Sequence, residues 1–213
     1  NIMPYYHIWA IGCQMNRAES DRLAARFEEL GYEVAKNIAD SDLIVLNSCV
    51  VRQSAEDRVR SRLDSLRPLK KSHPGTVLAV TGCLVSNEVD RLKESFPHVD
   101  YFFRPGECPP WLEGATPALP RRVAPSAFVP IIQGCNNFCS FCIVPYRRGR
   151  EKSRPAAEIA CEVSELVRRG AREVTLLGQN VDSYGHDLPS SPDLAGLLAE
   201  LNSIDGLARL RFL

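Results

Sequence analysis

Residues 42–49 read "DLIVLNSC", an apolar run that ends on a cysteine, and the chain repeats this design on either side of it. Residues 5–13, "YYHIWAIGC", and residues 76–83, "TVLAVTGC", also end on a cysteine. All three runs are rich in branched and aromatic side chains, which favour buried β-strands. The repeat predicts three equivalent strands whose carboxyl ends carry Cys13, Cys49 and Cys83.

A helical pattern follows the first two cysteines. After Cys13, apolar residues recur with a helical period until Gly31, and a similar series follows Cys49. The two series are Leu23, Phe27 and Leu30, and Ala55, Val59, Leu63 and Leu66. A shorter helix is predicted over residues 87–96, and strand-like segments over 31–37 and 99–103. Strands that alternate with helices predict right-handed crossovers and an open parallel sheet, a Rossmann or flavodoxin-like α/β domain over residues 1–115.

The three cysteines are expected to converge, because ligands bind beyond the carboxyl ends of the strands in such a sheet. Three thiols brought together suggest a metal or cluster site. The alternative is three buried structural cysteines, since cysteine is often buried. Cys108 lies in a proline-rich segment and shares none of the pattern.

A proline-rich stretch at residues 116–126 predicts a linker to a second domain over residues 127–213. This domain is expected to contain strands at 127–135, 172–180 and 207–213, with helices at 155–170 and 193–204. On the first helix, Ile159, Val163, Leu166 and Val167 share a face and Cys161 points away from it. The elements form the first part of a β/α barrel, which normally needs more strands, so we expect a truncated barrel.

The first strand of this domain leads into "GCNNFCSFCIVPYRRGR", residues 134–150, with cysteines at 135, 139 and 142. A structural zinc site uses four ligands, so three is the wrong number. An iron–sulfur cubane held by three thiolates leaves one iron available for chemistry. Two other classes remain open: a zinc-stabilised nucleic-acid-binding module needs a fourth ligand near each triad, and an electron-transfer protein with two clusters needs four thiolates per cluster.

Composition limits the classes further. The chain has 26 basic and 26 acidic residues and a net charge of zero, so a basic surface must be local. Such a segment follows the triplet, with Glu151 as its one acid; its basic residues are Arg147, Arg148, Arg150, Lys152 and Arg154. A solvated charged loop is the alternative. With neither a membrane-length apolar run nor a signal peptide, we expect a cytoplasmic protein without a membrane partner. Its 8 cysteines are then expected to be ligands before disulfides.

These motifs together resemble the radical S-adenosylmethionine methylthiotransferase family. The C-x3-C-x2-C triplet with Phe141 before its last cysteine is typical of radical S-adenosylmethionine enzymes, and the "GCQMN", "NSCVVR" and "TGC" contexts mark the methylthiotransferase branch. "GCQMN", "RQSAEDRV" and "LLGQNVDSYG" are similar to the members that make 2-methylthio-isopentenyladenosine next to the anticodon of tRNA. The family usually has "NTC" where this chain has "NSC", and the resemblance also implies a C-terminal RNA-binding domain that this sequence does not contain, so the fragment is expected to be inactive alone.

The resemblance implies two 4Fe-4S clusters and S-adenosylmethionine as cofactors. Cys135, Cys139 and Cys142 would hold the cluster that cleaves S-adenosylmethionine, and Cys13, Cys49 and Cys83 the cluster that delivers sulfur. Phe141, Gly178, Gln179 and Asn180 would contact S-adenosylmethionine, and Asn16 and Asn47 would line the second site. Arg147, Arg148 and Arg150 would contact the tRNA anticodon loop. An electron donor such as flavodoxin is implied, the sulfur source is open, and the alternative substrates are a ribosomal-protein aspartate and threonylcarbamoyladenosine in tRNA.

Overall fold

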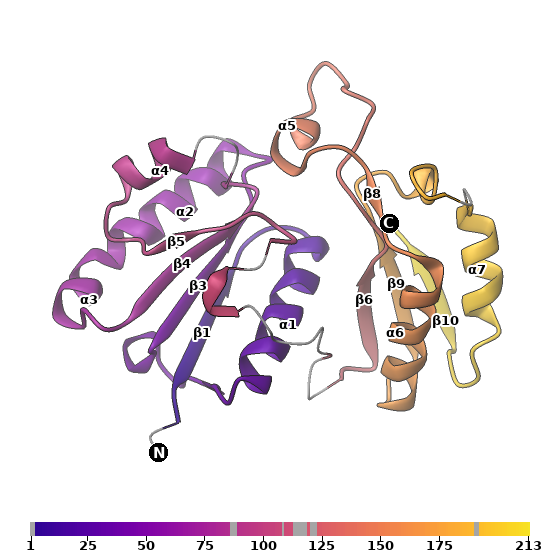
Figure 1. Ribbon diagram of the computed structural model, residues 1–213, viewed down its shortest axis with the longest axis horizontal. Coiled ribbons are helices and arrows are strands. Elements are labelled where there is room, and N and C mark those ends of the chain that lie inside the picture. The colour runs from indigo at the N-terminus through magenta and orange to yellow at the C-terminus, as the bar shows by residue number, and fades with distance from the viewer. Residues whose placement is uncertain (1–2, 86–88, 108, 113–118, 120–122, 190–191) are drawn as a thin grey trace. The chain divides into compact units, whose positions relative to one another are not determined.

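The computed structural model describes residues 3–85, 89–107, 109–112, 119, 123–189 and 192–213. It divides into two compact units, unit 1 from Asn1 to Ala118 and unit 2 from Leu119 to Leu213. Cys108 and most of the stretch predicted as a linker lie outside the described residues. The two units are drawn in Figure 1, with unit 1 in indigo to magenta.

Unit 1 is built on a five-stranded sheet in which every neighbouring pair is parallel. The order β2-β1-β3-β4-β5 is the flavodoxin-like one. The strands are β1 (Tyr5–Ala10), β2 (Glu33–Val34), β3 (Leu43–Ser48), β4 (Val77–Gly82) and β5 (Tyr101–Phe102). The predicted open parallel sheet is confirmed, and β1, β3 and β4, the strands that lead to the cysteines, are adjacent.

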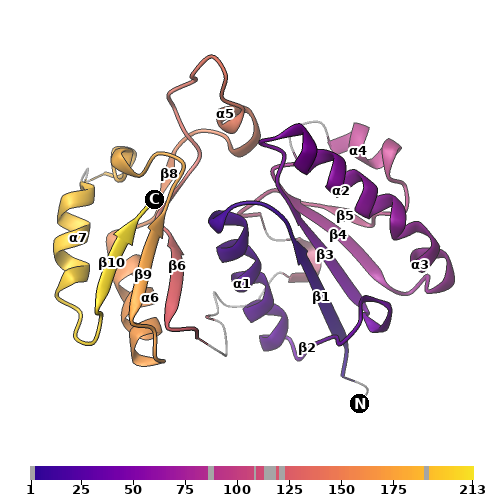
Figure 2. The same cartoon turned by 180° about the vertical axis from the view of Figure 1, so that it is seen from behind.

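Helices cover both faces of this sheet, as Figures 1 and 2 show from opposite sides. They are α1 (Gln14–Glu29), α2 (Gln53–Ser65), α3 (Arg67–Ser72) and α4 (Val89–Ser95), with short 3-10 turns at Ile38–Asp40 and Pro110–Leu112. Successive residues of β3 point to opposite faces. Ile44 and Leu46 belong to the core with α2 and α4, whereas Leu43 and Val45 belong to the core with α1.

One expectation about α1 is wrong. Leu30 was expected to continue the apolar face, but its side chain is 43% exposed. The helix ends at Glu29, and Gly31 follows with a φ of 87°, so the chain has already turned away from the helix axis at Leu30. Leu23 and Phe27 are buried as expected.

Unit 2 contains a three-stranded parallel sheet in the order β10-β9-β6. Its strands are β6 (Ser126–Pro130), β9 (Glu173–Leu177) and β10 (Arg209–Phe212). The helices α6 (Ala156–Arg168) and α7 (Leu194–Asn202) share a core with this sheet. Cys161 is exposed, as its position on α6 predicted. The arrangement is the first part of a β/α barrel.

Residues 127–135 do not form one strand. β6 ends at Pro130, where Ile131 donates its backbone N–H to the carbonyl of Leu177. The chain then leaves the sheet as β7 (Ile132–Gln133), which pairs antiparallel with β8 (Lys152–Ser153). This hairpin closes the long loop with the cysteine triplet, and the loop contains the short helix α5 (Val144–Arg148). Among the described residues, no helix is both long enough and apolar enough to cross a membrane.

Candidate cluster-binding sites

Cys13, Cys49 and Cys83, here called the strand-end triad, follow three adjacent parallel strands at the same edge of the unit 1 sheet. Ser48 lies opposite Gly82 in the ladder, so Cys49 and Cys83 each follow directly on one of two neighbouring strands. Cys13 stands at the start of α1. Cys49 and Cys83 are buried and Cys13 is exposed. The fold therefore brings the predicted residues to one edge.

Glycines allow the loops of this triad to approach closely. Gly12 has a φ of 137°, and a Cβ placed on it would lie 2.5 Å from the Cβ of Cys49. Gly82 has a φ of 89°, and its Cβ would lie 2.3 Å from the carbonyl oxygen of Ser48. Both φ values disfavour other residues. The two glycines keep the backbone beside Cys49 and Cys83 free of side chains.

The donor set of the strand-end triad fits an iron–sulfur cluster, because such clusters are held by cysteine thiolates. At Gly12 and Gly82 the backbone, and no bulky side chain, lies beside the thiols. Among the described residues, no three Cys, His, Asp or Glu side chains are grouped to hold a metal ion. The fit of the triad to a cluster therefore rests on its donor chemistry and on the sheet, which brings the three cysteines to one edge.

Cys135, Cys139 and Cys142, here called the loop triplet, lie on one continuous loop of unit 2. The N–H of Cys135 donates to the carbonyl of Gly149 (3.1 Å), and that of Cys142 to the carbonyl of Cys139 (3.0 Å). Gly134 has a φ of 82°, and a Cβ on it would lie 2.1 Å from the carbonyl oxygen of Arg150. The two ends of the loop are thus in close backbone contact beside the first cysteine.

The loop after β9 supports the triplet. The side-chain oxygen of Gln179 accepts a hydrogen bond from the N–H of Gly134 (2.6 Å). Glu151 accepts from the backbone and side-chain N–H groups of Asn136 (both 3.2 Å) and from the amide of Asn180 (3.3 Å). Gly178 is packed against Ile132, since a Cβ on it would lie 2.5 Å from Cγ2 of that residue. Gln179 and Asn180 therefore contact the loop that carries the loop triplet.

Asn136 and the role of Glu151 were missed by sequence reasoning. The available signal was Glu151 itself, the one acid within a basic segment. Its carboxylate links Asn136, inside the triplet loop, to Asn180, in the loop after β9.

The donor chemistry of the loop triplet also fits an iron–sulfur cluster, with three thiols on one loop. Cys135 is buried, Cys142 is half-buried and Cys139 is exposed. Phe141 is 92% exposed, so its ring covers no part of the protein core. It is available to a bound group beside Cys142.

The predicted arginine contacts lie just beyond the triplet. Arg147 and Arg148 belong to α5 and are half-buried. Arg150 is exposed, and its guanidinium lies 4.4 Å from the ring centre of Phe138, a cation–π geometry. Tyr146 meets the same ring edge-on at 5.6 Å. The sequence reasoning noted the arginines but missed Phe138 and Tyr146 beside them.

A carboxylate also anchors the β7–β8 hairpin. Asp187 accepts a hydrogen bond from the N–H of Ser153 (2.9 Å), and the N–H of Gly185 donates to the hydroxyl of Ser153 (2.9 Å). Burial raises the pKa of Asp187, but the hydrogen bonds from Ser153, a backbone hydrogen bond of Asp187 itself and the charge of His186 together outweigh this effect, so the pKa lies below its usual value. The hairpin is therefore tied to the loop after β9 by a charged acceptor.

Comparisons with known proteins define the class of this chain. Residues 129–212 match the family described as "Radical SAM superfamily", and residues 5–104 match "Uncharacterized protein family UPF0004". A solved radical S-adenosylmethionine methyltransferase of Kitasatospora setae has a similar fold, with a TM-score of 0.51 and 13% identity over 93% of this chain and 50% of that one. The chain carries a radical S-adenosylmethionine domain.

Curated relatives narrow the class. A Dehalococcoides mccartyi protein named tRNA-2-methylthio-N(6)-dimethylallyladenosine synthase is 59% identical over 99% of this chain and 51% of its own length. Proteins of the same name from Roseiflexus and Dictyoglomus thermophilum are 47% and 43% identical, over 98% and 99% of this chain and 46% and 53% of theirs. The chain spans about half the length of these relatives. It belongs to the radical S-adenosylmethionine methylthiotransferase family, which implies a 4Fe-4S cluster and S-adenosylmethionine.

Proposed function

We propose that the chain provides the cluster-binding part of a tRNA methylthiotransferase, which converts isopentenyladenosine next to the anticodon to its 2-methylthio derivative. The observation that carries the proposal is that each unit holds its own set of three cysteines. One set lies on a loop, and the other at the edge of a parallel sheet. Two sites of three thiolates suit two clusters that each leave one iron available.

In this proposal the loop triplet holds the cluster that, with S-adenosylmethionine bound, supplies radical chemistry. The residues of unit 2 orient it: Gln179 and Gly134 hold the loop at Cys135, and Asn180 acts through Glu151. The exposed ring of Phe141 and the backbone at Gly178 are the surfaces offered to S-adenosylmethionine. The strand-end triad holds the second cluster, where the sulfur is carried. An electron donor such as flavodoxin is required, in keeping with a cytoplasmic setting.

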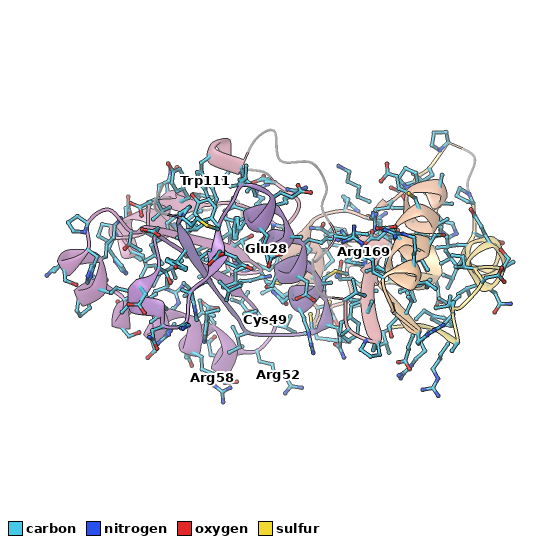
Figure 3. The ribbon with its side chains drawn as sticks, turned by 90° about the horizontal axis from the view of Figure 1, so that it is seen from below. Glu28, Cys49, Arg52, Arg58, Trp111 and Arg169 are labelled. Carbon is cyan, nitrogen blue, oxygen red and sulfur yellow. The ribbon has the colours of Figure 1, made fainter. Side chains whose placement is uncertain are left out.

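The proposed RNA contacts are Arg147, Arg148 and Arg150. RNA bases are read when they are unstacked in loops, and both guanidinium groups and aromatic rings stack on them. Arg150 and Phe138 provide such a pair at the rim of the loop triplet. In unit 1, the exposed Arg52 and Arg58 follow Cys49 on the chain and extend from the ribbon (Figure 3). Both units therefore offer local positive charge although the net charge is zero.

Nucleoside analysis tests the substrate. The chain, extended to the full length of its curated relatives, is incubated anaerobically with reductant, S-adenosylmethionine and tRNA that carries isopentenyladenosine, and the digested RNA is examined for the methylthio nucleoside. Parallel reactions contain a ribosomal protein, or tRNA with threonylcarbamoyladenosine. We expect product only on isopentenyladenosine tRNA, as the names of the relatives favour. Modification of the ribosomal protein alone would overturn the substrate while leaving the cofactors standing.

Cysteine substitutions test the two sites. Changing any residue of the loop triplet to alanine should abolish cleavage of S-adenosylmethionine. Changing any residue of the strand-end triad should stop methylthiolation but leave part of the cleavage to deoxyadenosine. Cys161→Ala is the matched control, because this exposed cysteine lies on α6 outside both sites. The same loss of both activities in the two sets would contradict separate roles.

A further inference from the structure

A connected set of buried polar groups lies directly behind the strand-end triad. Asn16 is 1% exposed and Asn47 and Ser48 are 0% exposed. The amide nitrogen of Asn16 donates to the side-chain oxygen of Asn47 (2.8 Å) and to the carbonyl of Ser48 (2.9 Å). The amide nitrogen of Asn47 donates to the carbonyl of Asn16 (2.8 Å) and to the hydroxyl of Ser20 (3.0 Å). Each amide therefore fixes the orientation of the other.

Ser48 extends these contacts to the third strand. Its hydroxyl donates to the carbonyl of Thr81 (2.6 Å) and accepts from the N–H of Leu84 (3.0 Å). Its carbonyl accepts from the N–H of Cys83 (2.9 Å) as well as from Asn16. Thr81 and Leu84 lie on either side of Cys83 in the chain. Ser48 therefore connects the segment of Cys83 to the segment of Cys49.

Asn16 connects the first cysteine to the same set. The thiol of Cys13 donates to the side-chain oxygen of Asn16 (3.3 Å). That oxygen is turned towards Cys13 because the amide nitrogen of Asn16 faces two acceptors on the other side. All three cysteine segments are thus joined through Asn16, Asn47 and Ser48, here called the polar bridge.

We propose that the polar bridge is a positioning device, which sets the spacing of Cys13, Cys49 and Cys83 before any group binds to them. The inference rests on the proposed cluster at the strand-end triad. Buried polar groups keep a unique geometry only when their partners are present, so each of these side chains constrains the others. Groups behind metal ligands orient them, and their loss typically reduces metal affinity by about 10- to 100-fold.

The test uses this chain with Cys135, Cys139 and Cys142 all changed to alanine, so that the bound iron belongs to the strand-end triad. In this background, Asn16→Asp places a carboxylate oxygen against the two acceptors that now receive hydrogen bonds. We expect bound iron and sulfide after anaerobic reconstitution to fall about tenfold or more. Asn202→Asp, at the exposed end of α7, is the control and should bind iron as the parent does.

A second pair of variants separates positioning from folding. In Ser48→Thr and Ser48→Val the new side chains have the same shape, but only threonine retains the hydroxyl that bonds to Thr81 and Leu84. Both are made in the same background without the loop-triplet cysteines. The affinity for phenylarsine oxide, which bridges neighbouring thiols, is measured on the iron-free protein. The melting temperature is measured separately by tryptophan fluorescence. Both tryptophans, Trp9 and Trp111, lie in unit 1, so fluorescence follows the unit that is changed. We expect Ser48→Val, compared with Ser48→Thr, to weaken arsenical binding severalfold and to alter the electron paramagnetic resonance spectrum of the reduced cluster.

The outcomes are distinguishable. Parental arsenical affinity and iron content in both Asn16→Asp and Ser48→Val would overturn the positioning role, whatever happens to the melting temperature. A parent that binds phenylarsine oxide but no iron would instead overturn the second cluster of the proposed function. In that case the arsenical affinities of the variants still decide the inference.

Discussion

The strand-end triad and the loop triplet use the same three thiols but are built in opposite ways. The loop triplet lies within residues 134–150, so its spacing is a local property of the chain. The strand-end triad exists only after β1, β3 and β4 have paired. Their supports also differ: carboxylates, together with the amide of Gln179, hold the surroundings of the loop triplet, whereas amides and hydroxyls hold the strand-end triad. The supports of the loop triplet therefore include titratable groups, whereas the polar side chains described behind the strand-end triad are neutral.

The largest expected effect concerns Gly134 in the loop triplet. Gly134→Ala places a Cβ 2.1 Å from the carbonyl oxygen of Arg150 at a φ of 82°. The backbone contact between the two ends of the loop cannot remain, at a cost of more than about 2 kcal/mol. In a background with Cys13, Cys49 and Cys83 changed to alanine, iron bound after reconstitution should fall more than tenfold.

Gly149→Ala is the control for this change. Gly149 has nearly the same φ, 81°, but apart from its two neighbours in the chain no atom of the described residues lies within 4 Å of its Cβ position. Its ψ is −163°, and essentially only glycine adopts this combination, so the variant should carry about 1–3 kcal/mol of backbone strain without adding a contact. Equal iron loss in both variants would show that left-handed strain, and not the contact with Arg150, governs the loop.

The corresponding change in the strand-end triad is Gly82→Ala. Its Cβ would lie 2.3 Å from the carbonyl oxygen of Ser48 and 2.6 Å from the side-chain oxygen of Asn47. We expect unit 1 to lose about 2 kcal/mol, measured by urea unfolding with tryptophan fluorescence. Gly31→Ala, with a φ of 87° and open space around it, should cost about half as much. A midpoint for Gly82→Ala that equals that of Gly31→Ala would mean that the strands separate without cost at this edge.

The difference between the sites also explains what the sequence could predict. Cysteine spacing identified the loop triplet without any fold. Cys13, Cys49 and Cys83 became a candidate site only because apolar runs at each cysteine predicted parallel strands, and parallel strands end at one edge of a sheet. Asn16 and Asn47 were expected to line the second site, and the structure shows that their buried side chains hydrogen-bond each other and Ser48.

The missed features depend on partners far along the chain. β7 and β8 have two residues each, too few for a periodic pattern, and pair across the loop triplet. The helix α3 was not predicted either, since its six residues include Pro68 and two lysines. The contact of Gln179 with S-adenosylmethionine stays a prediction, and its hydrogen bond to Gly134, which joins residues 45 positions apart, was not predicted. No local pattern reports such a contact.

A smaller effect is expected when that hydrogen bond is removed. Gln179→Leu leaves the N–H of Gly134 without its acceptor, a loss of about 1 kcal/mol. Gln179→Glu retains an oxygen that accepts the same bond. In the background without the strand-end cysteines, iron binding at the loop triplet should fall about fivefold for the leucine variant. The glutamate variant should stay close to the parent, and equal losses in both would assign Gln179 a role other than supporting the loop.

The smallest effect is the pH response that separates the two regions. The pKa of Asp187 in the folded protein lies below its usual value of 3.8, because the hydrogen bonds from Ser153, with smaller effects of its own backbone and of His186, outweigh the effect of burial. A carboxylate with a lowered folded pKa contributes stability that is present above the unfolded pKa and is lost as the pH falls through the folded pKa. The amides and hydroxyls of the polar bridge do not titrate in this range.

The measurement follows backbone amide resonances as the pH is lowered from about 4. The resonance of Ser153 should shift as Asp187 takes up a proton, while those of Asn16 and Asn47 should not follow the same titration. Asp187→Asn should remove the shift at Ser153, and Asp205→Asn, in an exposed turn, should leave it unchanged. A common titration at Ser153 and Asn16 would show that the strand-end triad also depends on a carboxylate, and the contrast between charged and neutral supports would then be wrong.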